Sequence, residues 1–309
     1  MRLSPRTVAS TFFAVLGFAA CLLAQTPAQQ PELPEFIKQG QQLMREGKLN
    51  EALALYRLNV QSSPHSTPAN IATGMVLDLM GQGGEARKYF AKANSVAEAP
   101  DAKAAADRGM AISYAFEGNC EKAVKYEQRV FDFNKNTKNF FQQGEIADEA
   151  ARICIDSGDF DAAYKWYKTG YETGLKEPGI TAARRDLWSF RWEHAQARIA
   201  ARRGNQAEAQ THITAARAIL DKGTNPEQAA FFPYLLGYVA FYAGNFKQAL
   251  EELNKANQND PFIQCMIGQT YEKLGEKDRA LEYYRRASTA IFHNPATAYA
   301  VPFSRKKLS

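Results

Sequence analysis

Small and large apolar residues recur at helical spacing along this chain, in seven similar blocks. Each block begins at a glycine, and an alanine follows five residues later. The seven pairs are Gly47–Ala52, Gly81–Ala86, Gly118–Ala123, Gly158–Ala163, Gly204–Ala209, Gly244–Ala249 and Gly275–Ala280. Nine residues after the glycine, several blocks carry an aromatic residue, as at Tyr56, Phe90 and Tyr284. The blocks start 31 to 46 residues apart, a period typical of helical repeat proteins.

This pattern predicts one helical hairpin in each block. The glycine ends a helix because it reaches positive φ at little cost. The alanine and the large residue four positions later share one face of the next helix. The alanine lets the two helices approach closely, and the large side chain fills the space beside it. Because no alternating Val, Ile or Thr run predicts a strand, we expect an all-α fold.

The blocks resemble the tetratricopeptide repeat (TPR) family, whose pattern places Leu-Gly and Tyr in a first helix and Ala, an aromatic residue and Pro in a second. The matches are Gly40, Ala52, Tyr56 and Pro64 in the first block, Leu236, Gly237, Ala249 and Pro261 in the sixth, and Ile267, Gly268, Tyr271, Ala280 and Tyr284 in the seventh. The third block matches least, with Ala111 for glycine, Glu127 for the aromatic residue and Tyr126 one position early. The resemblance covers residues 35–292 and implies a right-handed α-solenoid of about seven hairpins.

The segments between and after the blocks predict further features. Residues 176–179 predict a loop before a long helix at about 181–203, and residues 131–141 predict an extended helix end and a turn. The tail at 293–309 contains Pro295 and Pro302 and ends in basic residues. We therefore expect an irregular tail that covers the last helix.

The N-terminus has the pattern of a secretory signal peptide. Arg2 and Arg6 precede an apolar run at 8–24, and residues 25–34 form a polar, proline-rich linker. This pattern predicts removal of residues 1–24 and a periplasmic or secreted bacterial protein.

Two alternatives to a cleaved signal stay open. Phe18, Ala19, Ala20 and Cys21 resemble the bacterial lipobox, in which the cysteine becomes lipidated and anchors the chain to the membrane. The 17-residue apolar run is also near the lower length limit for an uncleaved membrane anchor.

The charge balance does not favour a nucleic-acid partner. The chain carries 38 Lys and Arg against 33 Asp and Glu. Without residues 1–24 the excess falls to three positive charges, which Arg305, Lys306 and Lys307 account for. The rest of the mature chain is therefore close to neutral.

The sequence contains no recognisable catalytic or metal site. Neither His65, His194, His212 nor His293 has a second histidine four residues away or a Cys-x-x-Cys nearby. The glycine-rich run at 81–84 lacks the strand and the Lys-Ser/Thr of a phosphate loop, so it is a hairpin turn. Glu193 and His194 have no nucleophile at a recognisable spacing. We expect a non-catalytic protein without a cofactor, a metal or a small-molecule substrate.

Cysteine positions suggest one disulfide. Cys120 begins the second helix of the third block, and Cys154 lies in the first helix of the next, which packs against it in such a stack. Export makes a Cys120–Cys154 bridge feasible. The alternative is that both are buried thiols, and Cys265 would be left unpaired.

The resemblance also implies which residues line the concave groove. In the fifth block these are Arg191, His194, Arg198 and Arg202, on one helix face. In the sixth they are Tyr234, Tyr238, Phe241 and Tyr242, and in the fourth Asp148, Glu149, Arg152 and Asp156. We call the sets of the fourth, fifth and sixth blocks the acidic, basic and aromatic ledges, and we expect them to follow one another along the groove. Arg198→Glu should then weaken partner binding without disturbing the fold. Alternatively, the arginines form a solvated face and the tyrosines belong to the core.

Taken together, these features predict an exported TPR scaffold or adaptor that binds a protein or peptide segment in its groove. The alternative function is a lipid-anchored structural or assembly component of a bacterial envelope complex. An enzyme is the third and least favoured class, because helical arrays of this kind usually bind other proteins.

Overall fold

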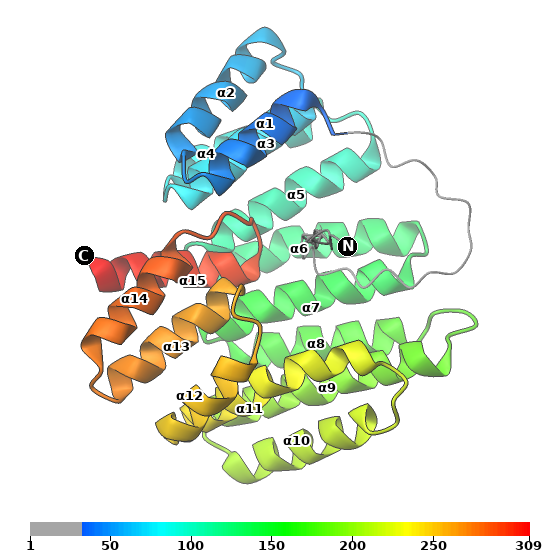
Figure 1. Ribbon diagram of the computed structural model, residues 1–309. Coiled ribbons are helices and arrows are strands. Elements are labelled where there is room, and N and C mark those ends of the chain that lie inside the picture. The colour runs from blue at the N-terminus through cyan, green and yellow to red at the C-terminus, as the bar shows by residue number, and fades with distance from the viewer. Residues whose placement is uncertain (1–32) are drawn as a thin grey trace, which may run out of the picture. The chain divides into compact units, whose positions relative to one another are not determined.

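The computed structural model describes residues 33–309, of which Glu35–Ser309 form one compact unit (Figure 1). Its α-helices are α1 (Glu35–Arg45), α2 (Leu49–Ser62), α3 (Thr67–Leu79), α4 (Gly83–Val96), α5 (Pro100–Ala115), α6 (Cys120–Asn136), α7 (Phe140–Ser157), α8 (Phe160–Gly174), α9 (Ala182–Arg202), α10 (Gln206–Leu220), α11 (Phe232–Tyr242), α12 (Phe246–Lys255), α13 (Pro261–Lys273), α14 (Lys277–Ser288) and α15 (Pro295–Leu308). A short 3-10 helix, η1 (Pro226–Phe231), precedes α11, and residues 33–309 contain no strand. The predicted all-α fold of seven hairpins, α1–α2 to α13–α14, is confirmed. The predicted signal peptide and most of the predicted linker lie outside the described residues.

The repeated glycine and alanine have the roles that their spacing predicts. All seven block glycines have positive φ, between 65° and 89°, and all seven block alanines are at most 2% exposed. The first helix of a hairpin also needs a small residue opposite the aromatic one. A Cβ atom on Gly40 would lie 2.2 Å from the Tyr56 ring, so only glycine allows this approach.

The long predicted helix is also present, as α9. Thr181 caps its first turn by accepting a hydrogen bond from Arg184 N at 3.1 Å. Its N-terminal half carries Trp188, which is 1% exposed and fills the space beside Gly144 on α7 and Gly174 on α8. The extra length of α9 therefore covers the ends of the preceding hairpin.

The third block keeps the common register although its sequence matches poorly. Glu127 is 0% exposed, so it occupies the buried position that an aromatic residue holds elsewhere. Burial raises the pKa of Glu127 well above its ordinary range, and the neighbouring Glu149 carboxylate adds to this shift. Arg108 opposes it. Such a group makes the folded state less stable as the pH rises, because the unfolded chain releases this proton more easily.

We expect Glu127→Gln to increase the free energy of unfolding more at pH 8 than at pH 5. The carboxyl group lowers stability only at a pH at which the unfolded chain ionises it, and the amide does not ionise. Urea unfolding at the two pH values measures this difference. Glu121→Gln on the same helix, where the carboxylate is 83% exposed, is the control. An increase of equal size at both pH values would contradict the assignment.

The prediction of an irregular C-terminal tail is wrong. Residues 295–308 form α15, in which Asn294 caps the first turn by accepting a hydrogen bond from Thr297 N at 2.9 Å. Pro295 is compatible with a first turn, where its missing N–H costs nothing. Pro302 lies inside the helix, so packing on the rest of the solenoid outweighs its low helix propensity.

The position of α15 brings the C-terminal end of the solenoid against its second to fourth hairpins. Besides its neighbours α13 and α14, α15 contacts α5 and α7 (Figure 1). His293, just before α15, lies 2.8 Å (Nε2 to Oδ2) from Asp78 on α3, and Arg305 donates to the Leu79 carbonyl oxygen at 2.5 Å. The His293 ring also lies between Phe90 and Phe116, with centroids 5.5 and 5.6 Å away. The last helix therefore closes the curve of the stack.

Candidate functional site

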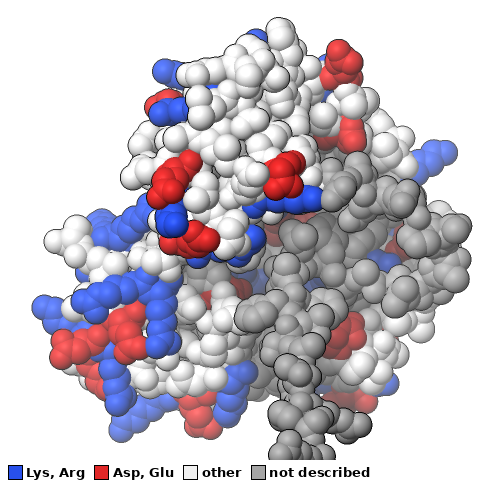
Figure 2. Space-filling model, turned by 45° about the horizontal axis from the view of Figure 1, so that its top comes forward, with Lys and Arg blue, Asp and Glu red and all other residues white. Residues whose placement is uncertain are grey.

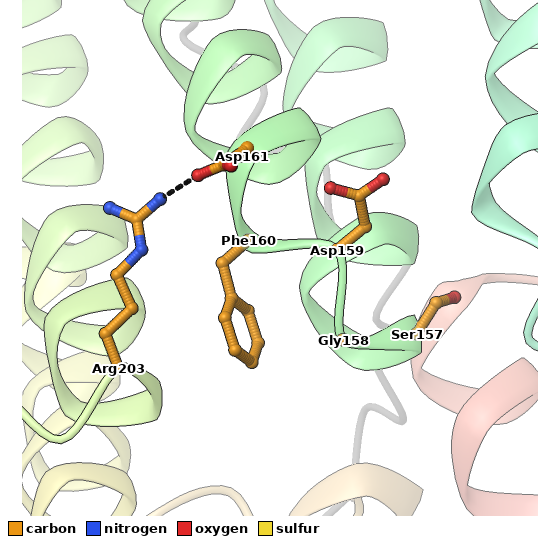
Figure 3. A pocket seen from close by; sticks show the side chains of 6 residues that line it. All are labelled: Ser157, Gly158, Asp159, Phe160, Asp161 and Arg203. Carbon is orange, nitrogen blue, oxygen red and sulfur yellow. Dashed lines mark hydrogen bonds and ion pairs between the residues drawn. The ribbon is translucent and has the colours of Figure 1, made fainter.

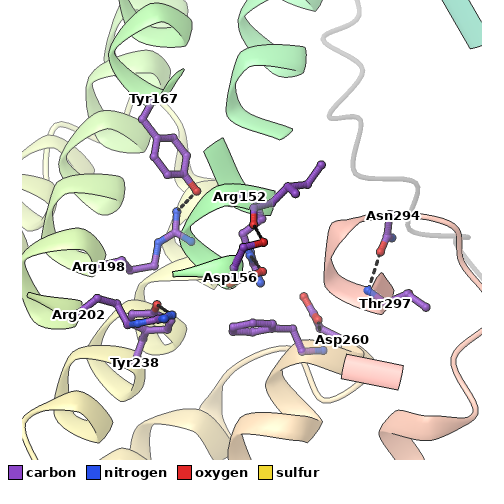
Figure 4. A network of polar contacts seen from close by, with 12 residues as sticks. Arg152, Asp156, Tyr167, Arg198, Arg202, Tyr238, Asp260, Asn294 and Thr297 are labelled. Carbon is purple, nitrogen blue, oxygen red and sulfur yellow. Dashed lines mark hydrogen bonds and ion pairs between the residues drawn. The ribbon is translucent and has the colours of Figure 1, made fainter. Parts of the chain in front are cut away.

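The first helices of the fourth to seventh hairpins gather polar side chains on their inner faces (Figure 4). Arg152 and Asp156 on α7 form an ion pair with Nε and Oδ2 2.9 Å apart. On α9, Arg198 Nη2 donates to the Tyr167 hydroxyl at 2.8 Å, and Arg202 Nη1 donates to the Tyr238 hydroxyl at 3.4 Å. We call Arg152, Arg198 and Arg202 the arginine cluster.

Four of the eight predicted partner-binding residues are buried, so the expectation that they face an open groove is wrong. Their exposed fractions are 8% for His194, 5% for Arg198, 7% for Tyr234 and 0% for Tyr238. They are buried because the aromatic face of α11 packs between α9 and α13, where His194 lies against Tyr234. Tyr238, for example, stacks on Phe262 of α13 with centroids 6.4 Å apart. The core interpretation therefore holds for these tyrosines.

The other four predicted residues, Arg191, Arg202, Phe241 and Tyr242, are partly exposed. Arg202 stacks on the Tyr242 ring at 4.9 Å from its centroid. Arg191 pairs with Glu145 and lies 4.0 Å from Asp148. Arg191 is thus the member of the basic ledge that meets the acidic one, and its charge is already paired.

Burial shifts the pKa values of several inner-face groups. It raises the pKa of Asp148 to about 7, with Arg191 opposing the shift. It also raises the pKa of Asp156, although all three members of the arginine cluster favour the ionised form. Burial, and then Arg198 and Arg152, lower the pKa of His194 well below its ordinary range, so its ring is neutral at pH 7.

Arg198→Glu should unfold the protein more easily instead of leaving the fold intact. The substitution removes the hydrogen bond to the Tyr167 hydroxyl and buries a carboxylate where burial already raises the pKa of Asp148 and Asp156, so we expect a loss of about 1–3 kcal/mol. Urea unfolding measures the loss. Arg217→Glu is the control, because Arg217 lies on the outer helix α10 with 61% of its side chain exposed. Equal stability of the two variants would contradict the buried position of Arg198.

A pocket of about 380 Å³ opens between α15, the α5–α6 turn and the end of α7. Its walls are mostly apolar and include Phe116, Tyr299, Pro302 and Phe303. Asp156 also lines it, so the pocket reaches the polar inner face. Sequence reasoning missed this pocket because one wall belongs to the tail that we expected to be irregular. The signal that could have revealed it is Asn294-Pro295, a capping residue followed by proline.

The Cys120–Cys154 disulfide joins two walls of this pocket. The cysteine Cα atoms are 4.9 Å apart in the structure, and Cys265 is a buried free thiol. Cys120 directly follows the α5–α6 turn, and Cys154 lies among the pocket residues Ile153, Asp156 and Ser157. The bridge therefore fixes the turn against α7.

Peptide mapping of exported protein without reductant should give a cross-linked Cys120–Cys154 peptide and a free Cys265. The oxidising compartment and the short Cα separation both favour the bond. The reduced and alkylated protein serves as the control. Recovery of Cys120 and Cys154 as free thiols would contradict the pairing.

A wider hollow of about 580 Å³ lies at the α7–α8 turn (Figure 3). Its polar groups are already engaged, since Asp161 pairs with Arg203 and Asp159 accepts a hydrogen bond from Ala162 N at 3.0 Å. Ser157 lines both this hollow and the 380 Å³ pocket. The two depressions therefore lie next to each other, on one edge of the solenoid.

Basic side chains are concentrated at the C-terminal end, on the left of Figure 2, with acidic ones among them. Residues 270–309 contain eight Lys and Arg and four Asp and Glu, whereas residues 33–269 contain 28 of each. Pairs such as Arg286–Glu282 and Lys307–Glu272 use part of this charge. Lys306, at the pocket, has no ion pair within residues 33–309.

The histidines and acids do not assemble a metal site in the part of the chain that the structure describes. Glu193 binds His212 instead of a nucleophile, with Oε2 and Nδ1 2.6 Å apart. The only aligned Ser, Asp and His side chains here, Ser113, Asp78 and His293, place the carboxylate in the middle, and this order cannot activate the serine. Between residues 33 and 309, no helix is both long and apolar enough to cross a membrane.

Residues 263–292, which include most of α13 and all of α14, match the model of the tetratricopeptide repeat. The apo form of RapI is similar over 88% of this chain and 97% of its own, at 14% identity and a TM-score of 0.53. A tetratricopeptide repeat protein from Parabacteroides merdae is similar over 88% and 98%, at 14% identity and a TM-score of 0.50. This chain has the tetratricopeptide repeat fold.

A third solved structure covers a smaller part of the TPR solenoid. It is a putative kinesin light chain of Podosopora anserina with nearly identical TPR-like repeats, similar over 61% of this chain and 94% of its own, at 17% identity and a TM-score of 0.50. No curated protein matches the chain in sequence. Because stacked helical repeats present extended surfaces to other proteins, the TPR fold supports a protein-interaction scaffold.

Proposed function

We propose that this chain is an exported, non-catalytic TPR scaffold that holds a segment of another protein at the edge formed by α15, the α5–α6 turn and the α7–α8 turn. The observation that carries this proposal is the 380 Å³ pocket, with its apolar walls and the unpaired Lys306 beside it. The disulfide supports the proposal because a pre-formed pocket loses less entropy when it is filled.

The chemistry of this edge favours a particular kind of partner segment. Phe116, Tyr299 and Phe303 suit a large aliphatic or aromatic side chain, since aromatic walls supply rigid contact area. The excess positive charge at 270–309 favours acidic residues next to that side chain. Arg191, Arg202, Phe241 and Tyr242 remain partly exposed and extend the proposed contact along the inner face, while the four buried residues support it from beneath.

The proposed export predicts a mature chain that begins at Gln25. Arg2, Arg6 and the apolar run at 8–24 motivate this expectation. Intact mass and N-terminal sequencing of protein from the envelope or medium provide the test. An intact Met1 on exported protein would contradict it, and a lipid-modified Cys21 would favour the alternative of a lipid-anchored component of an envelope complex.

Crosslinking pull-down from the native envelope fraction, followed by binding measurements with the purified partner, tests the proposed edge. We expect Lys306→Glu to weaken binding on the order of tenfold, because it reverses the attraction at the pocket. Ser157→Trp should have a similar effect by filling the pocket mouth.

The matched control is Lys165→Glu, a charge reversal at another exposed lysine, on α8. Circular dichroism would verify that all three variants fold. If Lys306→Glu and Ser157→Trp bind as tightly as Lys165→Glu does, the binding surface lies elsewhere on the solenoid.

A further inference from the structure

The arginine cluster brings together more positive charge than the surrounding carboxylates balance. Arg198 is 5% exposed, and it donates hydrogen bonds to the Tyr167 hydroxyl and the His194 carbonyl oxygen. Within residues 33–309, no carboxylate lies within 4.0 Å of Arg198 or Arg202. Buried charges in proteins are normally paired, so this arrangement lacks a counter-charge.

The nearest acids are already committed to other groups. Asp156 accepts from Arg152, and Asp260 Oδ1 accepts from Phe262 N at 2.8 Å at the start of α13. Asp148 lies beside Arg191. In Figure 4, Arg198 and Arg202 extend from α9 toward the side on which Asp156 and Asp260 lie. Burial also raises the pKa of all three acids, which reduces the negative charge available to the arginines.

Two buried donors in the same place have no acceptor. Arg152 Nη2 and the Tyr234 hydroxyl are both buried without a hydrogen-bond partner, and Tyr234 is only 7% exposed. The guanidinium carbons of Arg152 and Arg198 each lie 5.9 Å from the centroid of the Tyr234 ring. Two guanidinium groups therefore lie beside the ring whose hydroxyl lacks a partner. Unsatisfied buried donors cost stability, and an acceptor with two oxygen atoms would remove that cost.

We infer that the arginine cluster and Tyr234 form a binding site for a carboxylate group. The planar guanidinium of Arg152 suits a carboxylate, which can accept two parallel hydrogen bonds from an arginine. A carboxylate group is favoured over a phosphate dianion because the Asp156 carboxylate lies 2.9 Å from Arg152 Nε and repels a second charge at the same position, whereas a dicarboxylate carries its second charge on a separate group.

Arg152 gives the site one edge that is open to solvent. The Arg152 side chain is 20% exposed, and its partner Asp156 lines the 380 Å³ pocket. The carboxylate has two possible sources, namely a free small dicarboxylate or an acidic side chain of a bound protein segment. The inference does not depend on the proposed function, since a free dicarboxylate would occupy the site without any protein partner.

Titration calorimetry of the full mature chain with three probes tests this inference. The probes are succinate, inorganic phosphate and the peptide acetyl-Glu-Phe-amide, each in buffer whose ionic strength is held constant with sodium chloride. We expect succinate or the peptide to bind more tightly than phosphate. Binding by the peptide alone would identify a protein segment as the source, and equal or tighter binding by succinate would identify a free dicarboxylate.

Two variants and one control make the result specific. Arg152→Gln should weaken carboxylate binding at least tenfold, and Tyr234→Phe, which preserves the ring, should weaken it several-fold. Arg184→Gln should bind like the wild type, because Arg184 stacks on Phe141 at 4.0 Å much as Arg152 stacks on Phe262 at 4.1 Å, but lies outside the cluster.

Three results would overturn the assignment: no heat of binding with any probe, equal binding by the wild type and Tyr234→Phe, or tighter binding of phosphate than of either carboxylate. Tyr234→Phe decides the matter even if Arg152→Gln does not fold. The Lys306→Glu comparison measures partner binding at the edge separately, so failure of one proposal leaves the other intact.

Discussion

The contact between Asp78 on α3 and His293 before α15 joins residues that are 215 positions apart in the chain. In most repeat proteins each repeat touches only its neighbours, and the two ends of the stack remain independent. Here Asp78 is 1% exposed and also accepts a hydrogen bond from Ser113 on α5 at 2.8 Å. The pair thus holds the last helix against the second and third hairpins. The pocket beside α15 exists because of this closure, since α15 supplies one of its walls.

Closure also explains why sequence reasoning succeeded for the hairpins and failed for the inner face. The glycine-to-alanine spacing reflects contacts between adjacent helices, and the structure keeps it in the third block, where Tyr126 left the register open and Glu127 takes the buried position. Burial of Arg198 and Tyr238 depends instead on side chains of neighbouring hairpins, such as Tyr167 on α8 and Phe262 on α13. The pattern within one block does not show which side chains its neighbours bring. In the tail, Pro302 favoured an irregular segment. The structure has a helix there instead, and His293 just before it contacts a helix near the other end of the solenoid.

The inner face illustrates how a binding surface can become part of the core. The neighbouring hairpins cover arginines and tyrosines that a single hairpin would expose to a partner. Each of these side chains instead contacts other groups of the same chain. Arg198 binds the Tyr167 hydroxyl, and Arg202 lies against Phe160 and Tyr242. These groups supply hydroxyl oxygens and aromatic faces but little negative charge. That imbalance connects the fold to the proposed chemistry, because it favours an anionic ligand near α7 and α9 and an acidic segment at the adjoining edge.

Hydrogen exchange measured by mass spectrometry on the mature protein tests the closure most directly. In the wild type, the amides of α15 should be protected to a degree comparable with α13. In His293→Ala, the amides of α15 and of the C-terminal half of α3 should lose protection together, while α9 and α10 stay unchanged. His65→Ala, at an exposed position on the α2–α3 connection, should change neither segment. If α15 exchanges freely in the wild type, or keeps its full protection in His293→Ala, the Asp78–His293 contact does not close the solenoid.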